Sequence, residues 1–178
     1  MDRIVLGSGN LYVTEYTGNI PLDDIIETPE NLIGAIKGGA SLEYSASKYT
    51  AIDDSGKRTK NILTEETAKI KTGIMTWNGR TLEKLSSTAR VSESGKKRTV
   101  RIGGIQNQNG KNYLVRFHHL DPKDGDCRVT IVGTNQAGLT LVFAKDKETV
   151  INAEFQAMPQ PDGTLIIYEE EIIGGSGE

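Results

Sequence analysis

The stretch from Cys127 to Tyr168 constrains the fold more strongly than any other part of this sequence. Apolar residues recur at every second position of Leu139–Ala144 and again of Ile151–Ala157, and clusters of Gly, Pro, Asn and Asp or charged residues separate the segments. This period-two pattern predicts antiparallel strands with one buried face. We expect a meander that forms the core, with strands at Cys127–Gly133, Leu139–Ala144, Val150–Ala157 and Thr164–Tyr168.

The composition is that of one globular domain, residues 1–178, because a chain of 178 residues is long enough to bury a core. The net charge of -3 favours no particular class of partner, and no apolar run is long enough to span a membrane. The single cysteine, Cys127, excludes an intrachain disulfide. The residues Met1–Ile4 lack a signal-peptide pattern, so we expect folding in a cytoplasm.

Two segments carry too few apolar residues to bury themselves. The irregular segment 18–38 is a long loop with an acidic group at Asp23 and Asp24 and an apolar pair, Leu32 and Ile33. Loops of this length are uncommon in compact domains, so it is either an ordered surface crossover or a contact with a partner.

The second is a long hairpin whose strands run from Ala40 to Ile52 and return through Lys57–Leu63 and Thr67–Thr72. Its tip, residues 48–60, turns at Asp53–Gly56 and is nearly all polar. An isolated ribbon is marginal in water, so this arm is either flexible or lies on another subunit.

A single helix is predicted at 78–89, where Asn78 is a favourable N-cap and Trp77 is a core anchor spaced to staple Leu82. Ser92–Lys97 is expected to be a polar turn. Asn109-Gly110 predicts a hairpin between the strands Arg98–Ile102 and Tyr113–Phe117, and residues 172–178 are expected to form a flexible tail.

No constellation for catalysis is recognisable. His118 and His119 are adjacent on a strand, so their side chains point to opposite faces and cannot chelate one ion together. Either histidine with Cys127 gives only two of the ligands that zinc requires. The glycine pairs lack the spacing of phosphate-binding loops. We therefore expect no enzyme, and no catalytic, cofactor or metal site.

The sequence AGLTLVFAKDKETVINAEFQAMPQPDGTLIIYEEE, residues 137–171, resembles the C-terminal part of major tail tube proteins of long-tailed, siphovirus-type bacteriophages. Those proteins share its order of strands and turns, the acid-x-aromatic step at Glu154-Phe155 and the last strand with Tyr168. The resemblance extends back to the opening GSGNLYV, residues 7–13. It implies a mostly β fold of two packed antiparallel sheets, a sandwich or barrel, with one flanking α-helix and a long hairpin arm.

The same resemblance implies a structural subunit that assembles into hexameric rings, which stack as a tube for genome delivery. The implied partners are identical copies, the tape-measure protein, tail-terminator or tip proteins, and transiting double-stranded DNA bound without sequence specificity. The implied location is the virion tail, after synthesis in the bacterial host cytoplasm. The candidate subunit contacts are Tyr49, Ile52, Asp53, Asp54, Ser55, Gly56 and Lys57 of the arm, and Asp23, Asp24, Leu32 and Ile33 of the loop.

A tube that conducts DNA should present neutral or acidic side chains to its lumen, because basic walls would bind the phosphates. The polar faces Glu43/Ser45/Ser47 and Thr67/Lys69/Lys71 are candidates for the lumen or for the outer surface. Two alternatives remain open. One is the tube of a contractile tail or a type VI-like injection machine, and the other is an immunoglobulin-like adhesion or sugar-binding module.

Overall fold

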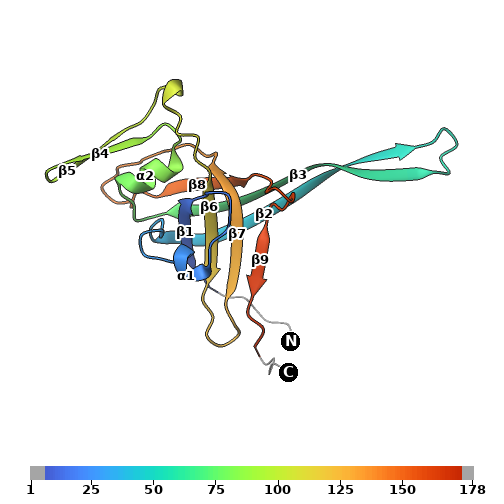
Figure 1. Ribbon diagram of the computed structural model, residues 1–178, viewed down its shortest axis with the longest axis horizontal. Helices are drawn as coiled ribbons and strands as arrows, with labels where there is room; N and C mark the ends of the chain where they lie inside the picture. The colour runs from blue at the N-terminus through green and yellow to red at the C-terminus, as the bar shows by residue number, and fades with distance from the viewer. Residues whose placement is uncertain (1–6, 174–178) are drawn as a thin grey trace.

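A computed structural model of the chain describes residues 7–173 (Figure 1). The segment Arg3–Leu6, where the sequence pattern also allows a short strand, and residues 174–178 of the predicted tail lie outside this range. The elements, in chain order, are β1 (Asn10–Glu15), α1 (Asp23–Ile26), β2 (Ile36–Ile52), β3 (Thr59–Ile74), α2 (Gly79–Leu85), β4 (Arg90–Ser94), β5 (Lys97–Arg101), the 3₁₀ turn η1 (Ile105–Asn107), β6 (Tyr113–His119), β7 (Cys127–Asn135), β8 (Ile151–Ala157) and β9 (Ile167–Glu170).

The prediction of a mostly β protein is confirmed. The described residues form a seven-stranded antiparallel sheet, a separate two-stranded sheet of β4 and β5, and two short α-helices. The large sheet has the order β1-β6-β7-β8-β3-β2, and β9 pairs with β7. Figure 1 shows β1, β6 and β7 crossing the direction of β8, β3 and β2.

Strand β7 is where the sheet changes direction. Its first half, Cys127–Thr130, pairs with β9, whereas its last residues, Gly133–Asn135, pair with β8. Gly133 is required at this junction, because a Cβ atom there would lie 1.9 Å from the carbonyl oxygen of Gln156. The glycine therefore permits the close approach of β8 that brings the two halves of the sheet together.

The core lies between these two halves. Its fully buried side chains include Val13 and Val115 from β1 and β6, and Ile70 and Phe155 from β3 and β8. Leu82 and Leu85 of α2 pack on the same cluster. On β6, Tyr113, Val115 and Phe117 line this core, whereas Leu114, Arg116 and His118 face the opposite side.

Helix α2 is shorter than the predicted 78–89 and begins after the predicted N-cap. The Asn78 side chain accepts hydrogen bonds from the backbone N–H groups of Arg80 and Thr81, at 2.8 and 3.4 Å. Trp77 packs against the core, as predicted, and its indole N–H donates to the carbonyl of Thr149. The helix ends early because Ser86 is extended.

Two local predictions are wrong, and a third is right only in part. Leu139–Ala144 forms no strand, although Leu139 and Leu141 do pack on the core. The turn predicted over Ser92–Lys97 is confined to Gly95 and Lys96, because the residues on either side belong to the paired strands β4 and β5. Asn109-Gly110 does not join two paired strands, because β5 pairs with β4 and β6 pairs with β1 and β7.

Candidate functional site

The hairpin of β2 and β3, called the arm, extends far beyond the body of the molecule (Figure 1). Its strands pair from Ile36↔Ile74 out to Ile52↔Thr59, with irregularities between Lys37 and Ala40 and between Ser47 and Lys48. Near the body β3 also pairs with β8, from Lys69 to Ile74. From Ser41 to Ile52 in β2 and from Thr59 to Glu66 in β3, every residue except Ala51 is exposed. The distal arm therefore has no core of its own.

Both faces of the distal arm carry large apolar side chains. Tyr49 and Ile62 lie directly opposite one another on one face and are 61% and 46% exposed. Leu63 and Ile52 project from the other face, which continues the side of the ribbon that carries buried Ile70 near the body. Full burial of a side chain of this size contributes about 1.5–3 kcal/mol, so a partner that covered these residues would stabilise the arm substantially.

The arm tip is an ordered turn around Asp53. Its Oδ1 accepts hydrogen bonds from the N–H groups of Lys57 and Arg58, at 2.9 and 3.0 Å, and Oδ2 accepts one from the Ser55 hydroxyl at 2.7 Å. These bonds, that from Arg58 first, lower the pKa of the Asp53 carboxyl. Gly56 has a φ of 69°, a conformation that favours glycine. The tip is therefore a defined shape that a partner could recognise.

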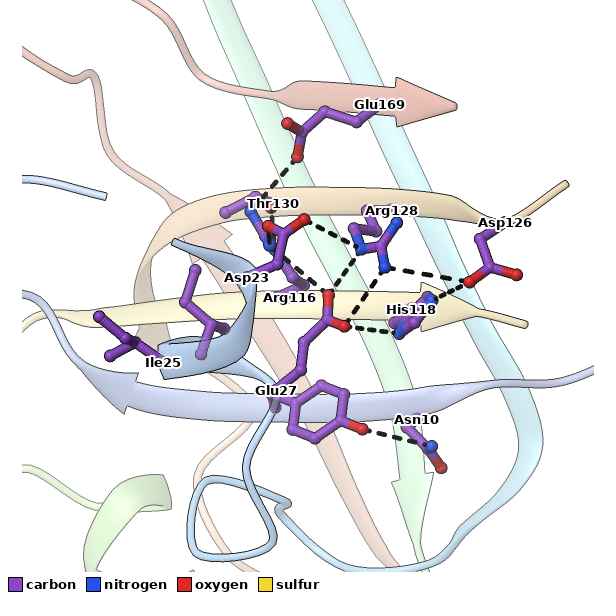
Figure 2. Close-up of polar contacts among 12 residues, drawn as sticks. Asn10, Asp23, Ile25, Glu27, Arg116, His118, Asp126, Arg128, Thr130 and Glu169 are labelled. Atoms are coloured by element: carbon purple, nitrogen blue, oxygen red, sulfur yellow. Dashed lines mark hydrogen bonds and ion pairs between the residues drawn. The ribbon is translucent and has the colours of Figure 1, made fainter. Parts of the chain in front are cut away.

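A second feature, called the charge cluster, lies on the opposite face of β6 and β7 from the core, beneath α1 (Figure 2). Arg116 of β6 is at its centre and is only 2% exposed. Its Nε donates to the Thr130 hydroxyl at 2.9 Å, and its terminal nitrogens contact the carboxylates of Asp23 and Glu169. One guanidinium thus joins helix α1 to strand β9.

Glu27 is the second centre of the charge cluster. Its carboxylate binds the Arg128 guanidinium through both oxygens, at 2.7 and 3.4 Å, and this pairing raises the pKa of Arg128. Glu27 Oε2 also lies 2.9 Å from Nδ1 of His118, whose Nε2 lies 2.9 Å from Asp126. Both ring nitrogens of His118 therefore face carboxylates.

Asp126 completes the cluster from the loop between β6 and β7. Its Oδ1 accepts a hydrogen bond from the N–H of Asp121 at 2.8 Å. This bond and the one with His118 lower the pKa of the Asp126 carboxyl. The charge cluster therefore consists of Asp23, Glu27, Arg116, His118, Asp126, Arg128 and Glu169.

The structure separates the predicted contact residues into two distant groups, the arm tip and the 18–38 segment (Figure 1). Within the second group, Asp23 binds Arg116, and Asp24 is exposed. Leu32 forms a bridge with Tyr12 of β1 and remains 38% exposed. The prediction for Ile33 needs correction, because this residue is 2% exposed and belongs to the core, so it offers no side chain to a partner.

The local sequence pattern does not reveal the charge cluster, and it predicted no site at His118. The members of the cluster come from α1 and the residue that follows it, from β6, β7, the loop before β7, and β9, so no local spacing brings them together. One signal was present: Arg116 and His118 occupy the same face of a strand whose other residues are mostly apolar. A guanidinium on a buried strand requires a carboxylate partner from elsewhere in the chain.

Among residues 7–173 no group of three or more His, Cys, Asp or Glu side chains is arranged to hold a metal ion. None of the described helices is both long and apolar enough to cross a membrane. No protein-family model matches this chain, and no curated protein sequence matches it either.

Proposed function

We propose that this protein is the structural subunit of a phage tail tube, which polymerises as stacked hexameric rings. The observation that carries the proposal is the arm, a β-ribbon that leaves the body and exposes apolar side chains such as Tyr49 and Ile62 on its faces. A ribbon of this kind is only marginally stable in water and is stabilised when it packs on a neighbouring copy. The resemblance of residues 137–171 to tail tube proteins supports the same assignment.

The edges of the large sheet support ring assembly as well. The outer edge of β1 is covered, because Val13 N–H donates to the carbonyl of Asn31 and Ile33 N–H donates to that of Leu11. Strand β2 is the other edge, and within residues 7–173 no strand pairs with its outer side. An open edge seventeen residues long is a template for pairing with another chain. In the finer architecture we propose, the two halves of the sheet act as the two layers of a sandwich, and one layer joins its neighbours in a closed barrel.

The polar side of the arm near the body suits a wall past which DNA moves. Lys71 pairs with Glu43 at 2.7 Å, and Lys69 pairs with Glu154 at 2.6 Å. The pairing with Glu43 raises the pKa of Lys71, and that with Lys69 lowers the pKa of Glu154. Each lysine is matched by a carboxylate, so this side of the sheet offers DNA phosphates no excess positive charge.

In this role the partners are identical copies, the tape-measure protein, tail-terminator or tip proteins, and double-stranded DNA in transit. The protein acts in the tail of the virion after synthesis in the host cytoplasm. No catalysis is required of it, because all the proposed work is assembly and conduction.

Negative-stain electron microscopy of the purified protein at rising concentration, with and without a tail-tip nucleus, tests the proposal. We expect hollow tubes from the wild type. We expect none from a variant in which Asn-Gly replaces residues 48–64, since Ser47 and Glu65 lie directly opposite and a two-residue turn can join them. Circular dichroism shows whether this variant keeps its fold.

A point variant sharpens the test. Tyr49→Ser with Ile62→Ser removes exposed apolar surface from the arm, and Val142→Ser with Phe143→Ser removes a comparable exposed pair from elsewhere. We expect only the first pair to prevent tubes. Wild-type protein that stays monomeric under every condition, or a deleted arm that leaves tubes intact, contradicts the proposal.

A further inference from the structure

The β4–β5 hairpin is a second ribbon, at the opposite end of the molecule from the arm (Figure 1). Residues 90–101 contain five basic side chains and a single carboxylate, Glu93, a net charge of +4. The whole chain has a net charge of -3, so the remaining residues carry -7. The hairpin is therefore a concentrated positive charge on an acidic protein.

The two faces of this hairpin differ. Val91, Glu93, Arg98 and Val100 share the face turned toward α2, where Val100 packs on the core and Glu93 pairs with Arg98 at 2.7 Å. The other face, called the basic face, carries Arg90, Lys97 and Arg101. No carboxylate within residues 7–173 forms an ion pair with these three side chains, and all three are exposed.

Within the basic face, Arg90 and Arg101 lie directly opposite one another on the paired strands. Like charges in this position destabilise a two-stranded ribbon, which is already marginal without further support. Ile102 and Ile105 follow the hairpin and are 47% and 85% exposed. The hairpin thus combines uncompensated cations with exposed aliphatic side chains, and both need a partner.

The complementary surface lies on the same chain, around the charge cluster. Segments 15–30 and 162–171 contain nine carboxylates and no lysine or arginine, and Arg116 holds the two segments together through Asp23 and Glu169. The outward carboxylates here, called the acidic surface, are Asp23, Asp24, Glu169 and Glu171. Glu170 pairs with Cys127 and projects from the other face of β9, so it is not part of this surface. Leu22 and Ile25, beside Asp23 and Asp24, are 73% and 56% exposed.

We propose that the basic face of one copy, with Ile102 and Ile105, docks on the acidic surface of a second copy, with Leu22 and Ile25. This rests on the proposed self-assembly and names a contact additional to the arm. In this contact cations meet carboxylates, and aliphatic side chains meet aliphatic side chains. DNA would match the cations through its phosphates but would offer no aliphatic surface to Ile102 and Ile105. The two surfaces differ, so the contact is heterologous and propagates a ring or a stack of rings.

Charge reversal tests the contact. Arg90→Glu with Arg101→Glu, and separately Asp24→Lys with Glu171→Lys, should each raise the protein concentration needed for assembly by at least about tenfold, because like charges then face one another. The chain that carries all four substitutions should assemble near the wild-type concentration. Asp24 and Glu171 are chosen because neither is among the carboxylates that pair with Arg116, so the ion pairs of the charge cluster stay intact.

The control is Lys145→Glu with Lys147→Glu, an equal charge reversal at exposed positions that belong to neither surface, which should leave assembly nearly unchanged. Sedimentation velocity and negative-stain microscopy supply the readouts, and circular dichroism reports the fold of each variant. Wild-type tubes together with unimpaired assembly of the Arg90/Arg101 variant overturn this inference but leave the proposed function standing. Wild-type protein that never associates overturns the proposed function itself.

Two further outcomes decide the partner class. Failure of the fourfold variant to recover assembly, when both pairs impair it, shows that the two surfaces do not meet and overturns the inference. Fluorescence anisotropy with a short DNA duplex supplies the other outcome. Tight binding that the Arg90/Arg101 variant loses, with assembly unaffected, would identify the basic face as a nucleic-acid site instead.

Discussion

Replacing Arg116 by Met should destabilise the folded monomer by about 3 kcal/mol, because removal of one partner from a buried ion pair costs about 3–5 kcal/mol. The lower end of that range follows from the surroundings. The side chains of Asp23 and Glu169 are about half exposed, at 51% and 49%, and can be hydrated once the guanidinium is gone. Glu27 is 12% exposed but keeps Arg128 and His118 as partners.

Urea unfolding followed by circular dichroism measures this loss on monomeric protein. For a chain of this size each kcal/mol lowers Tm by about 2–4 °C, so thermal unfolding should shift down by about 6–12 °C. Arg80→Met is the matched control, because Arg80 also pairs with a carboxylate, Glu93 at 3.5 Å, but is 68% exposed. Its cost should stay below about 1 kcal/mol. Equal, small losses in the two variants would refute the view that the charge cluster holds the body together.

Three smaller predictions concern the same body. The free energy of unfolding should fall as the pH drops below about 4, because the lowered pKa of Asp126 means that its carboxylate stabilises the folded state only while it is ionised. In urea unfolding measured across pH, Asp126→Asn should reduce this loss. Asn78→Ala should cost about 1 kcal/mol in urea unfolding, because the variant loses the side-chain cap of α2. Gly133→Ala should cost about 1–3 kcal/mol or more in the same assay, because the new methyl group would meet the Gln156 carbonyl where β8 joins β7.

The parts of the fold that follow from local pattern could be predicted. The arm was predictable because Asp53–Gly56 is a strong turn and the strand before it alternates from Ala40 to Ser47, and β7 and β8 follow from similar local patterns. Leu139–Ala144 shows the limit of that logic. Its alternating pattern reflects the packing of Leu139 and Leu141 on the core. A strand also needs a neighbouring strand that hydrogen-bonds with its backbone, and among the described residues no strand pairs with this segment.

The charge cluster could not be predicted from local pattern, since its ion pairs join residues as distant as Asp23 and Arg116. The acids of segment 18–38 look like solvated loop charges until the strand that carries Arg116 and His118 is placed beneath them. The segment is therefore an ordered crossover, and its contact with a partner remains part of the proposal. Asp23 and Glu27 fasten it to the body, whereas Asp24 and its neighbours remain on the surface.

In the proposed assembly, this division lets one chain fold by itself while its two ribbons still lack the contacts that a neighbouring copy would supply. The body holds itself together through a core between two halves of one sheet and through ion pairs beneath α1. The two ribbons lie at opposite ends and share none of that stabilisation beyond their bases. A contact that orders a ribbon on a neighbour therefore adds free energy that the monomer lacks, without requiring the body to change. Assembly of such subunits should be limited by the cost of ordering the ribbons, which an existing ring reduces by presenting its surfaces in fixed positions.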